Sequence, residues 1–204
     1  MNFYYNGTDI YNDVSVNYCV HEMFAEKQAD TLVIRFNDTK GIWSKWQPAA
    51  GDTVRFKEGA SDTGKMFIHS MKPENGLFTI RAMSMPKTAK IRKSKSWEGV
   101  RFLQLANEFA GNHGLTFKNY GCEDQVYPYI KQDNEGDFSL FSRLCMLEGC
   151  QMLIFDGSLL AYNEHYIEQQ EPAGSLTVDE NGVFTYEDNR DTMFGSCEVA
   201  SGSY

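Results

Sequence analysis

The side chains of this sequence that could carry chemistry are its thiols and imidazoles, five cysteines and four histidines in 204 residues. Cys122 and His113 come closest to a nucleophile with its base, since a catalytic thiol needs an imidazole or another cation to lower its pKa. Nothing in the sequence around Cys122 would lower that pKa. We therefore expect the cysteines to be reduced thiols that mostly fill the core.

The spacing of these residues matches neither a metal site nor a disulfide framework. The cysteines are odd in number and include no C-x-x-C pair, and the histidines form neither H-E-x-x-H nor H-x-H. The acidic run 133–137 has the wrong spacing for an EF-hand. A G-x-S-x-G elbow and a glycine-rich phosphate loop are also absent. The sequence predicts a protein that is not an enzyme and that uses no metal or cofactor.

Two tryptophans, Trp43 and Trp46, follow Phe36 closely and allow two interpretations. They could line a carbohydrate or nucleic-acid groove on a small β-barrel. Alternatively, they anchor a loop onto the barrel or onto a neighbouring subunit, where large amphipathic rings are enriched. We favour the anchor.

The segment 87–95 holds five basic residues in nine positions. It could be a nucleic-acid patch, but no aromatic residue lies within it to stack on a base, and the chain carries a net charge of −9. A solvated linker or edge strand that contacts an acidic neighbour fits better. The resulting interface candidates are Trp43, Trp46, Lys90, Arg92, Lys93 and Trp97.

The charge is divided unevenly along the chain. Residues 1–121 carry 16 Lys and Arg against 12 Asp and Glu, whereas residues 122–204 carry 3 against 16. Opposite potentials of this kind can steer like subunits or neighbouring proteins into one register. No run of 18 apolar residues occurs, and the N-terminus does not resemble a signal peptide, so we expect a protein that is cytosolic when made.

The elements that must position these residues fall into two groups, which predict an α+β, mainly β fold. Period-2 alternation and turn residues dominate the first 86 positions, with predicted strands at 14–20, 31–36, 52–57, 65–70 and 77–82. Strands this short and closely spaced usually close into a small barrel. We therefore predict an N-terminal β-barrel.

The second group consists of two helices, a hairpin and a polar stretch. Ser96 is the predicted N-cap of a helix that carries Trp97 and Val100 on its apolar face and ends at Gly114.

A second helix, capped by Asp137, runs to Gly149; its predicted apolar members are Leu140, Phe141, Leu144, Cys145 and Leu147. Segments 150–155 and 158–162 flank an Asp-Gly pair that suits a two-residue type I′ turn. Two more strands are predicted at 175–178 and 183–186.

Three stretches in this order resemble the late control protein D family, the hub of contractile phage tails, phage-derived bacteriocins and related injection systems. They are residues 93–100 entering a helix that ends at 112–115, residues 135–144 followed by Glu148-Gly149, and the hairpin at 153–160. The resemblance covers about residues 10–190. It implies two related β-barrels in a ring-shaped trimer that connects the tail tube to the spike, assembled in the bacterial cytoplasm and carried in the particle.

The resemblance also sets the expected domain boundaries. We expect a β-barrel at 1–86, a basic linker at 87–95, an inserted region of two helices and a hairpin at 96–174, and strands of an incomplete second barrel at 175–204. Family members usually continue past this point, so either another polypeptide completes the second barrel or the chain is a truncated version. The expected function is a structural hub subunit; the alternative is a ligand-binding barrel for nucleic acid or glycan.

Overall fold

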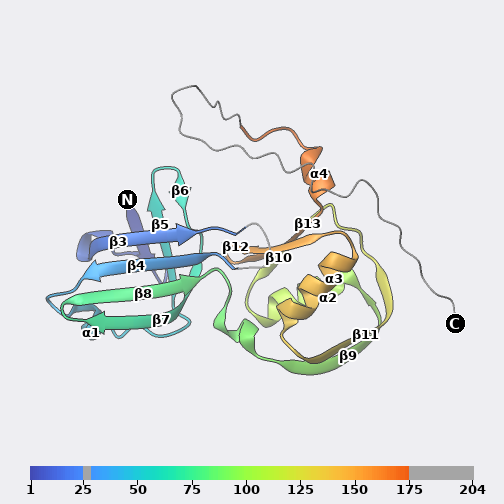
Figure 1. The fold of residues 1–204 in the computed structure, drawn as a ribbon, viewed down its shortest axis with the longest axis horizontal. Helices are drawn as coiled ribbons and strands as arrows, with labels where there is room; N and C mark the ends of the chain where they lie inside the picture. Colours follow the sequence, from blue (N-terminus) through green and yellow to red (C-terminus); the bar gives the residue numbers. More distant parts are fainter. Residues whose placement is uncertain (25–28, 175–204) are drawn as a thin grey trace, which may run out of the picture. The chain divides into compact units, whose positions relative to one another are not determined.

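Strands dominate the first part of the chain (Figure 1). The computed structural model describes residues 1–24 and 29–174. Eight strands of the first 83 residues form one antiparallel sheet in the order β2-β1-β5-β7-β8-β4-β3, with β6 paired to β5. Their bounds are β1 Asn2–Tyr5, β2 Thr8–Asp9, β3 Ser15–Glu22, β4 Thr31–Asn37, β5 Thr53–Glu58, β6 Ser61–Asp62, β7 Met66–Glu74 and β8 Leu77–Met83.

Alternation along these strands buries one face of the sheet. In β4 and β8 every second residue is buried, because successive side chains of a strand point to opposite faces. The short helix α1, Ile42–Trp46, brings Trp43 onto this face. The Trp43 ring stacks on Phe78 at 5.3 Å between centroids and lies 4.7 Å from Phe36. Trp43 is therefore the centre of an aromatic core.

The predicted α+β, mainly β class is confirmed. Each of the five predicted N-terminal strands has a counterpart, namely β3, β4, β5, β7 and β8. The prediction missed β1, β2 and β6, which are too short to give a clear alternation signal. We expected closure into a barrel, but within the described residues the hydrogen-bonded path is open, with β2 and β3 as its two ends.

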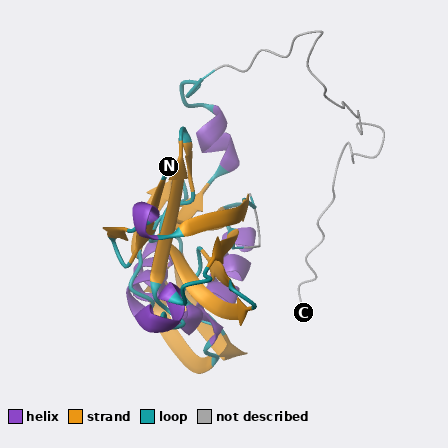
Figure 2. Cartoon of the chain, turned by 90° about the vertical axis from the view of Figure 1, so that its left-hand side faces the viewer, coloured by secondary structure: helices purple, strands orange, loops and turns teal. Residues whose placement is uncertain are grey.

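From residue 87 onward, helices and strands are mixed. Strands β9 Lys93–Arg101 and β11 Val126–Glu135 form an antiparallel pair. Strand β13 Ser158–Tyr162 lies between β10 Thr116–Tyr120, to which it is parallel, and β12 Gln151–Phe155, to which it is antiparallel. The remaining elements are the 3-10 helices η1 Tyr11–Asp13 and η2 Lys87–Lys90 and the α-helices α2 Phe102–Asn112, α3 Asp137–Leu147 and α4 Glu164–Glu168. Figure 2 distinguishes these helices from the strands.

The predicted helix start at Ser96 is wrong. Residues Lys93–Arg101 are strand β9, and α2 begins only at Phe102. Trp97 and Val100 both face the core at a spacing of three, which imitates a helix. Gly99 lies between them with a left-handed φ of +59°, and their partners on β11, Tyr127 and Ile130, pack on the same core at the same spacing. The expected linker 87–95 accordingly contains η2 and the first residues of β9.

Helix α3 lies where a helix was predicted, but its start differs in detail. Its N-cap is Gly136, and no side chain caps it, so Asp137 does not play the predicted capping role. Four of the predicted apolar members are buried, whereas Leu147 is 70% exposed. The prediction also missed β10 and β11.

The predicted hairpin is confirmed as β12 and β13. Asp156 and Gly157 both have positive φ, +44° and +72°, as a type I′ turn requires. The Lys65 backbone N–H donates to the Asp156 carboxylate at 2.9 Å, so the turn contacts the residue that precedes β7. At Gly64, an added Cβ would lie 3.0 Å from the Asp156 Cβ, which leaves room only for glycine.

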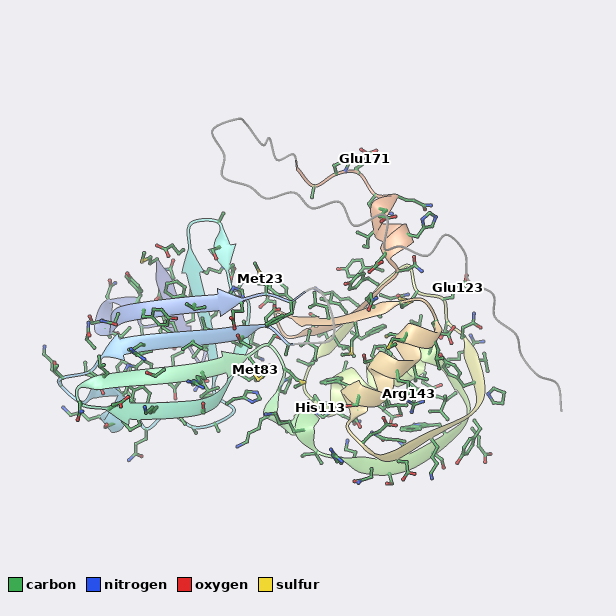
Figure 3. All side chains as sticks on the ribbon, viewed as in Figure 1. Met23, Met83, His113, Glu123, Arg143 and Glu171 are labelled. Atoms are coloured by element: carbon green, nitrogen blue, oxygen red, sulfur yellow. The ribbon has the colours of Figure 1, made fainter. Side chains whose placement is uncertain are left out.

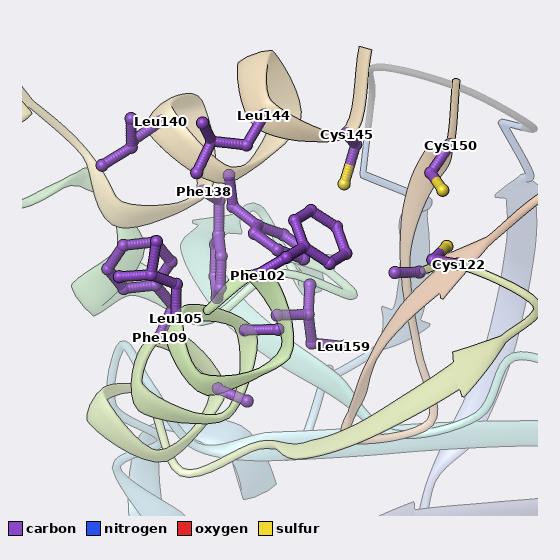
Figure 4. Packing of buried hydrophobic residues seen from close by; sticks show 14 of the residues in the cluster. Phe102, Leu105, Phe109, Cys122, Phe138, Leu140, Leu144, Cys145, Cys150 and Leu159 are labelled. Carbon is purple, nitrogen blue, oxygen red and sulfur yellow. The ribbon is translucent and has the colours of Figure 1, made fainter. Parts of the chain in front are cut away.

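Helices α2 and α3 pack together on one face of the three-stranded sheet. Phe102 stacks on Phe141 at 5.1 Å between centroids, and Phe109 meets Phe141 edge-on at 6.3 Å. Figure 4 shows this core, in which Leu105 and Leu159 are also completely buried. No helix in the described ranges is long and apolar enough to cross a membrane.

The described elements above belong to one compact unit, Met1–Gln170. The predicted division into a barrel, a linker and an inserted region stays a prediction. The strands predicted at 175–178 and 183–186 lie outside the described residues.

Trp43 gives the first testable prediction. We expect Trp43→Ala to lower the free energy of unfolding by about 3–5 kcal/mol, because it leaves a cavity among Phe36 and Phe78. Trp46→Ala is the matched control, since that ring is 39% exposed, and should change stability by less than about 1 kcal/mol. Urea unfolding followed by circular dichroism measures both variants; equal losses would show that Trp43 is not the centre of the core.

Candidate functional site

The largest group of chemistry-bearing side chains in the described residues surrounds a buried carboxylate. Asp137 Oδ2 accepts hydrogen bonds from Lys93 Nζ at 3.0 Å and from Asn112 Nδ2 at 3.0 Å, and lies 3.1 Å from His113 Nε2. Its other oxygen, Oδ1, accepts from Gln132 Nε2 at 2.9 Å. The Asp137 cluster, as we call these five residues, thus joins β9, the end of α2, β11 and the start of α3.

The electrostatics of the Asp137 cluster favour one charge state. Burial alone would raise the pKa of Asp137, but hydrogen bonds from Gln132, Lys93 and Asn112 outweigh it and hold the pKa below its ordinary value. Burial lowers the pKa of His113, against the opposing attraction of the Asp137 carboxylate. The cluster therefore holds a charged carboxylate beside a neutral imidazole at neutral pH.

A hydroxyl completes the sequence of groups that a nucleophilic site would need. Thr88 Oγ1 lies 2.9 Å from His113 Nδ1, so hydroxyl, imidazole and carboxylate follow one another. Thr88 and His113 also line a hollow of about 480 Å³ whose lining is mostly apolar. However, the Asp137 carboxylate is shared among three further donors. We assign the arrangement a positioning role, in which Thr88 fixes η2 to α2 through the His113 ring.

The Cys122 and His113 pair considered from the sequence is not formed. Both ring nitrogens of His113 are bonded elsewhere, to Thr88 and Asp137. Cys122 is buried with Cys145 and Cys150, and Figure 4 shows the three thiols together. Burial raises the pKa of Cys145 to about 12 and also raises that of Cys122, which opposes nucleophilic chemistry.

The described residues do not form a metal site. Among the residues that the structure describes, no group of three or more His, Cys, Asp or Glu side chains could hold a metal ion. The four described cysteines are free thiols; Cys197 lies outside the described residues.

The three tryptophans predicted as interface candidates differ in how deeply they are buried. Trp43 is 1% exposed, so this fold leaves it no surface to present to a partner, and its predicted interface role is wrong. Trp46 is exposed and meets Trp43 edge-on at 5.3 Å. Trp97 is half-buried; its indole N–H donates to Glu108 at 3.1 Å, and Lys95 Nζ lies 4.7 Å from its ring centroid. Of the three, Trp46 is the most available for a contact.

The three basic residues predicted as interface candidates also differ in their surroundings. Lys93 pairs with Asp137 and so contributes to the fold. Lys90 and Arg92 are exposed, and within the described ranges neither has an ion-pair partner. These two remain candidates for a contact with an acidic group.

Sequence reasoning missed an apolar surface on the three-stranded sheet. Leu153, Phe155, Leu160 and Tyr162 line a hollow of about 430 Å³ on the face of the sheet away from α2 and α3, together with Ile167 of α4. Phe155 is 36% exposed and Ile167 44%. Sheets with parallel strands are normally covered on both faces. The continuous apolar run of β12 was the available signal, since it indicates a strand apolar on both sides.

Comparison with known proteins finds similarity in structure only. No protein-family model matches the sequence, and no curated protein matches it. The 43 kDa tail protein of prophage MuSo2 from Shewanella oneidensis is 13% identical with a TM-score of 0.55, over 79% of this chain and 53% of that one.

Two more solved structures are similar to the same degree. The tail protein from Neisseria meningitidis MC58 is 12% identical with a TM-score of 0.57, over 78% of this chain and 50% of that one. The Escherichia coli c3393 protein, a type VI secretion component similar to the T4 tail proteins gp27 and gp5, is 14% identical with a TM-score of 0.58, over 80% and 49%. The described fold is thus the fold of tail proteins, and the chain spans about half the length of these structures.

His113 should make stability depend on pH. An unfolded histidine binds its proton near pH 6.5, whereas the folded His113 binds it at lower pH, so acid favours the unfolded chain. We expect the free energy of unfolding to fall as the pH is lowered from about 7 to about 5, with a smaller slope in His113→Gln. His165→Gln, which changes an exposed histidine, should keep the slope of the parent protein. An unchanged slope in His113→Gln would refute this assignment.

Removal of the central carboxylate should be costly. We expect Asp137→Ala to reduce stability by about 3–5 kcal/mol, because the donors around it lose a buried, charged acceptor. The control is Asp133→Ala, whose side chain is 71% exposed and pairs with Lys131. Its cost should stay below about 1 kcal/mol in the same urea titration. Similar losses in both variants would contradict a central role for Asp137.

Proposed function

We propose that this chain is a structural subunit of a phage tail or of a related injection particle, and more specifically a baseplate hub subunit that connects tail tube and spike. The observation that carries the proposal is the shared fold, which extends over about four-fifths of the chain in tail and type VI secretion proteins. In this role the protein acts through burial of surfaces and catalyses no reaction.

The surfaces of the described residues suit such a role. The apolar sheet face around Phe155 has the composition of an interface centre, and exposed apolar patches of this kind commonly mark binding sites. The only complete arrangement of hydroxyl, imidazole and carboxylate identified among the described residues is used to fix η2, α2 and α3. A ring-shaped trimer, with tube, spike and other baseplate proteins as partners, is the assembly that we propose.

A nucleic-acid or glycan-binding barrel is the second candidate. Lys90 and Arg92, which have no ion-pair partner within the described ranges, favour its nucleic-acid form. Burial of Trp43 and the ion pair of Lys93 remove two of its expected contacts. We therefore rank it below the assembly role.

A pull-down against the neighbouring tail proteins tests the assembly role. We expect the tagged chain to retain tube or spike protein, and Phe155→Asp to weaken retention by roughly 30-fold or more, because it places a charge in a desolvated interface. Val126→Asp on β11 is the matched control, since Val126 is also apolar and 53% exposed. Both variants must show the circular dichroism of the parent protein.

Two outcomes would count against the proposal. A chain that retains no tail protein under any salt condition is not a hub subunit. Retention that Phe155→Asp and Val126→Asp weaken equally would remove the sheet face from the interface.

A further inference from the structure

We propose that a basic hollow beside β4, β7 and β8 is a docking site for the acidic end of a second copy of this chain. The inference deepens the proposed assembly role, on which it rests, by naming the surface through which identical subunits meet. The basic hollow is defined by Arg81, Lys87 and Lys90, and the acidic end by the surface around Glu123, Glu148 and α4.

The basic hollow presents three exposed cations. Arg81 extends from β8 and Lys87 and Lys90 from η2, and they line a hollow of about 480 Å³ that no carboxylate lines. Within the described ranges none of the three has an ion-pair partner, whereas Lys93 and Lys95 are paired with Asp137 and Glu108.

The described carboxylates nearest to the hollow have hydrogen-bond donors of their own. Glu22, on β3, accepts a hydrogen bond from the Thr31 hydroxyl at 2.8 Å. Asp30 is buried and accepts from the Phe24 backbone N–H at 2.9 Å. Between Glu74 and Glu98 the sequence contains six basic residues and no acidic one. The hollow is therefore a cationic surface with partly apolar walls, which is suited to an acidic protein segment.

The acidic end of the chain has the complementary charge. Glu123 and Glu148 line a second hollow of about 470 Å³, which no lysine or arginine lines. Glu164 and Glu168 of α4 are exposed. Glu148 accepts a hydrogen bond from the Tyr127 hydroxyl at 2.6 Å, and Glu123 accepts one from Gln125 Nε2 at 3.1 Å.

Local contacts hold α4 in place on this surface. The Asn163 N–H donates to the Tyr120 carbonyl at 2.9 Å, and the Asn163 side chain caps α4 by accepting from the Tyr166 N–H at 3.1 Å. Tyr166 packs so closely on Gly121 that an added Cβ there would lie 2.3 Å from its ring. The backbone of α4, which carries Glu164 and Glu168, is thus held on this surface.

The two surfaces cannot satisfy each other within one copy. Figure 3 labels Met83, which lines the basic hollow, and Glu123, which lines the acidic one, and the two lie well apart. Because the paired surfaces differ, the contact between copies is head-to-tail, and such contacts generate closed rings or open chains. This geometry agrees with the proposed ring of identical subunits.

Complementary charge reversal tests the contact. By sedimentation velocity at about 50 mM salt we expect the parent chain to self-associate, and at about 500 mM salt we expect roughly tenfold weaker association. Lys87→Glu with Lys90→Glu should remain monomeric at low salt, and so should Glu164→Lys with Glu168→Lys. An equal mixture of the two double variants should form a one-to-one complex, since each supplies the surface that the other has lost.

The control is Lys40→Glu with Lys45→Glu, which makes the same change in net charge at two exposed lysines elsewhere and should associate like the parent chain. A parent chain that is monomeric at both salt concentrations, or a mixture that forms no complex, would overturn the inference. Binding of a single-stranded oligonucleotide that depends on Lys87 and Lys90, without self-association, would also overturn it.

The same variants separate this inference from the proposed function. If the parent chain retains tail proteins but shows no charge-dependent self-association, only the docking contact fails. If charge-dependent self-association occurs but no tail protein is retained, the hub role fails and the contact stands.

Discussion

The need to pair one buried carboxylate constrains the described fold beyond residue 87. Asp137 is 1% exposed, and an unpaired charge at that depth would cost several kcal/mol. Its donors come from β9, the end of α2 and β11, so these elements must meet at the start of α3. Through His113 the same constraint reaches Thr88 in η2. The Asp137 cluster and Thr88, whose hydroxyl, imidazole and carboxylate groups resemble those of a catalytic site, thus determine how these elements are arranged.

A second constraint connects the hairpin to the N-terminal sheet. The turn between β12 and β13 requires positive φ at Asp156 and Gly157, and this turn places the Asp156 carboxylate against the Lys65 N–H and 3.6 Å from Arg55. The ion pair of Asp156 with Arg55 is long and partly exposed, so its contribution to stability is small. These contacts orient the hairpin, and β12 and β13 of the hairpin also carry the apolar sheet face around Phe155.

The proposed function rests on the shared fold, and two surfaces of the described residues agree with it. An apolar sheet face and a cationic hollow without carboxylates are features that folding alone does not require, whereas the thiols and the imidazole are used inside the protein. The fold is shared with tail proteins of 12–14% identity. The chain spans about half the length of those structures.

The sequence by itself determined the strand-rich N-terminal half, the second helix and the Asp-Gly hairpin, because alternation and turn chemistry act over a few residues. It did not determine where α2 begins, since Trp97 and Val100 give strand β9 the apolar spacing of a helix. Nor could it show that Trp43 is core or that Lys93, Asn112, His113, Gln132 and Asp137 converge, because these residues are separated by up to 44 positions and form no motif. Only the tertiary structure brings them together, since burial of a charge is decided by all of its neighbours at once.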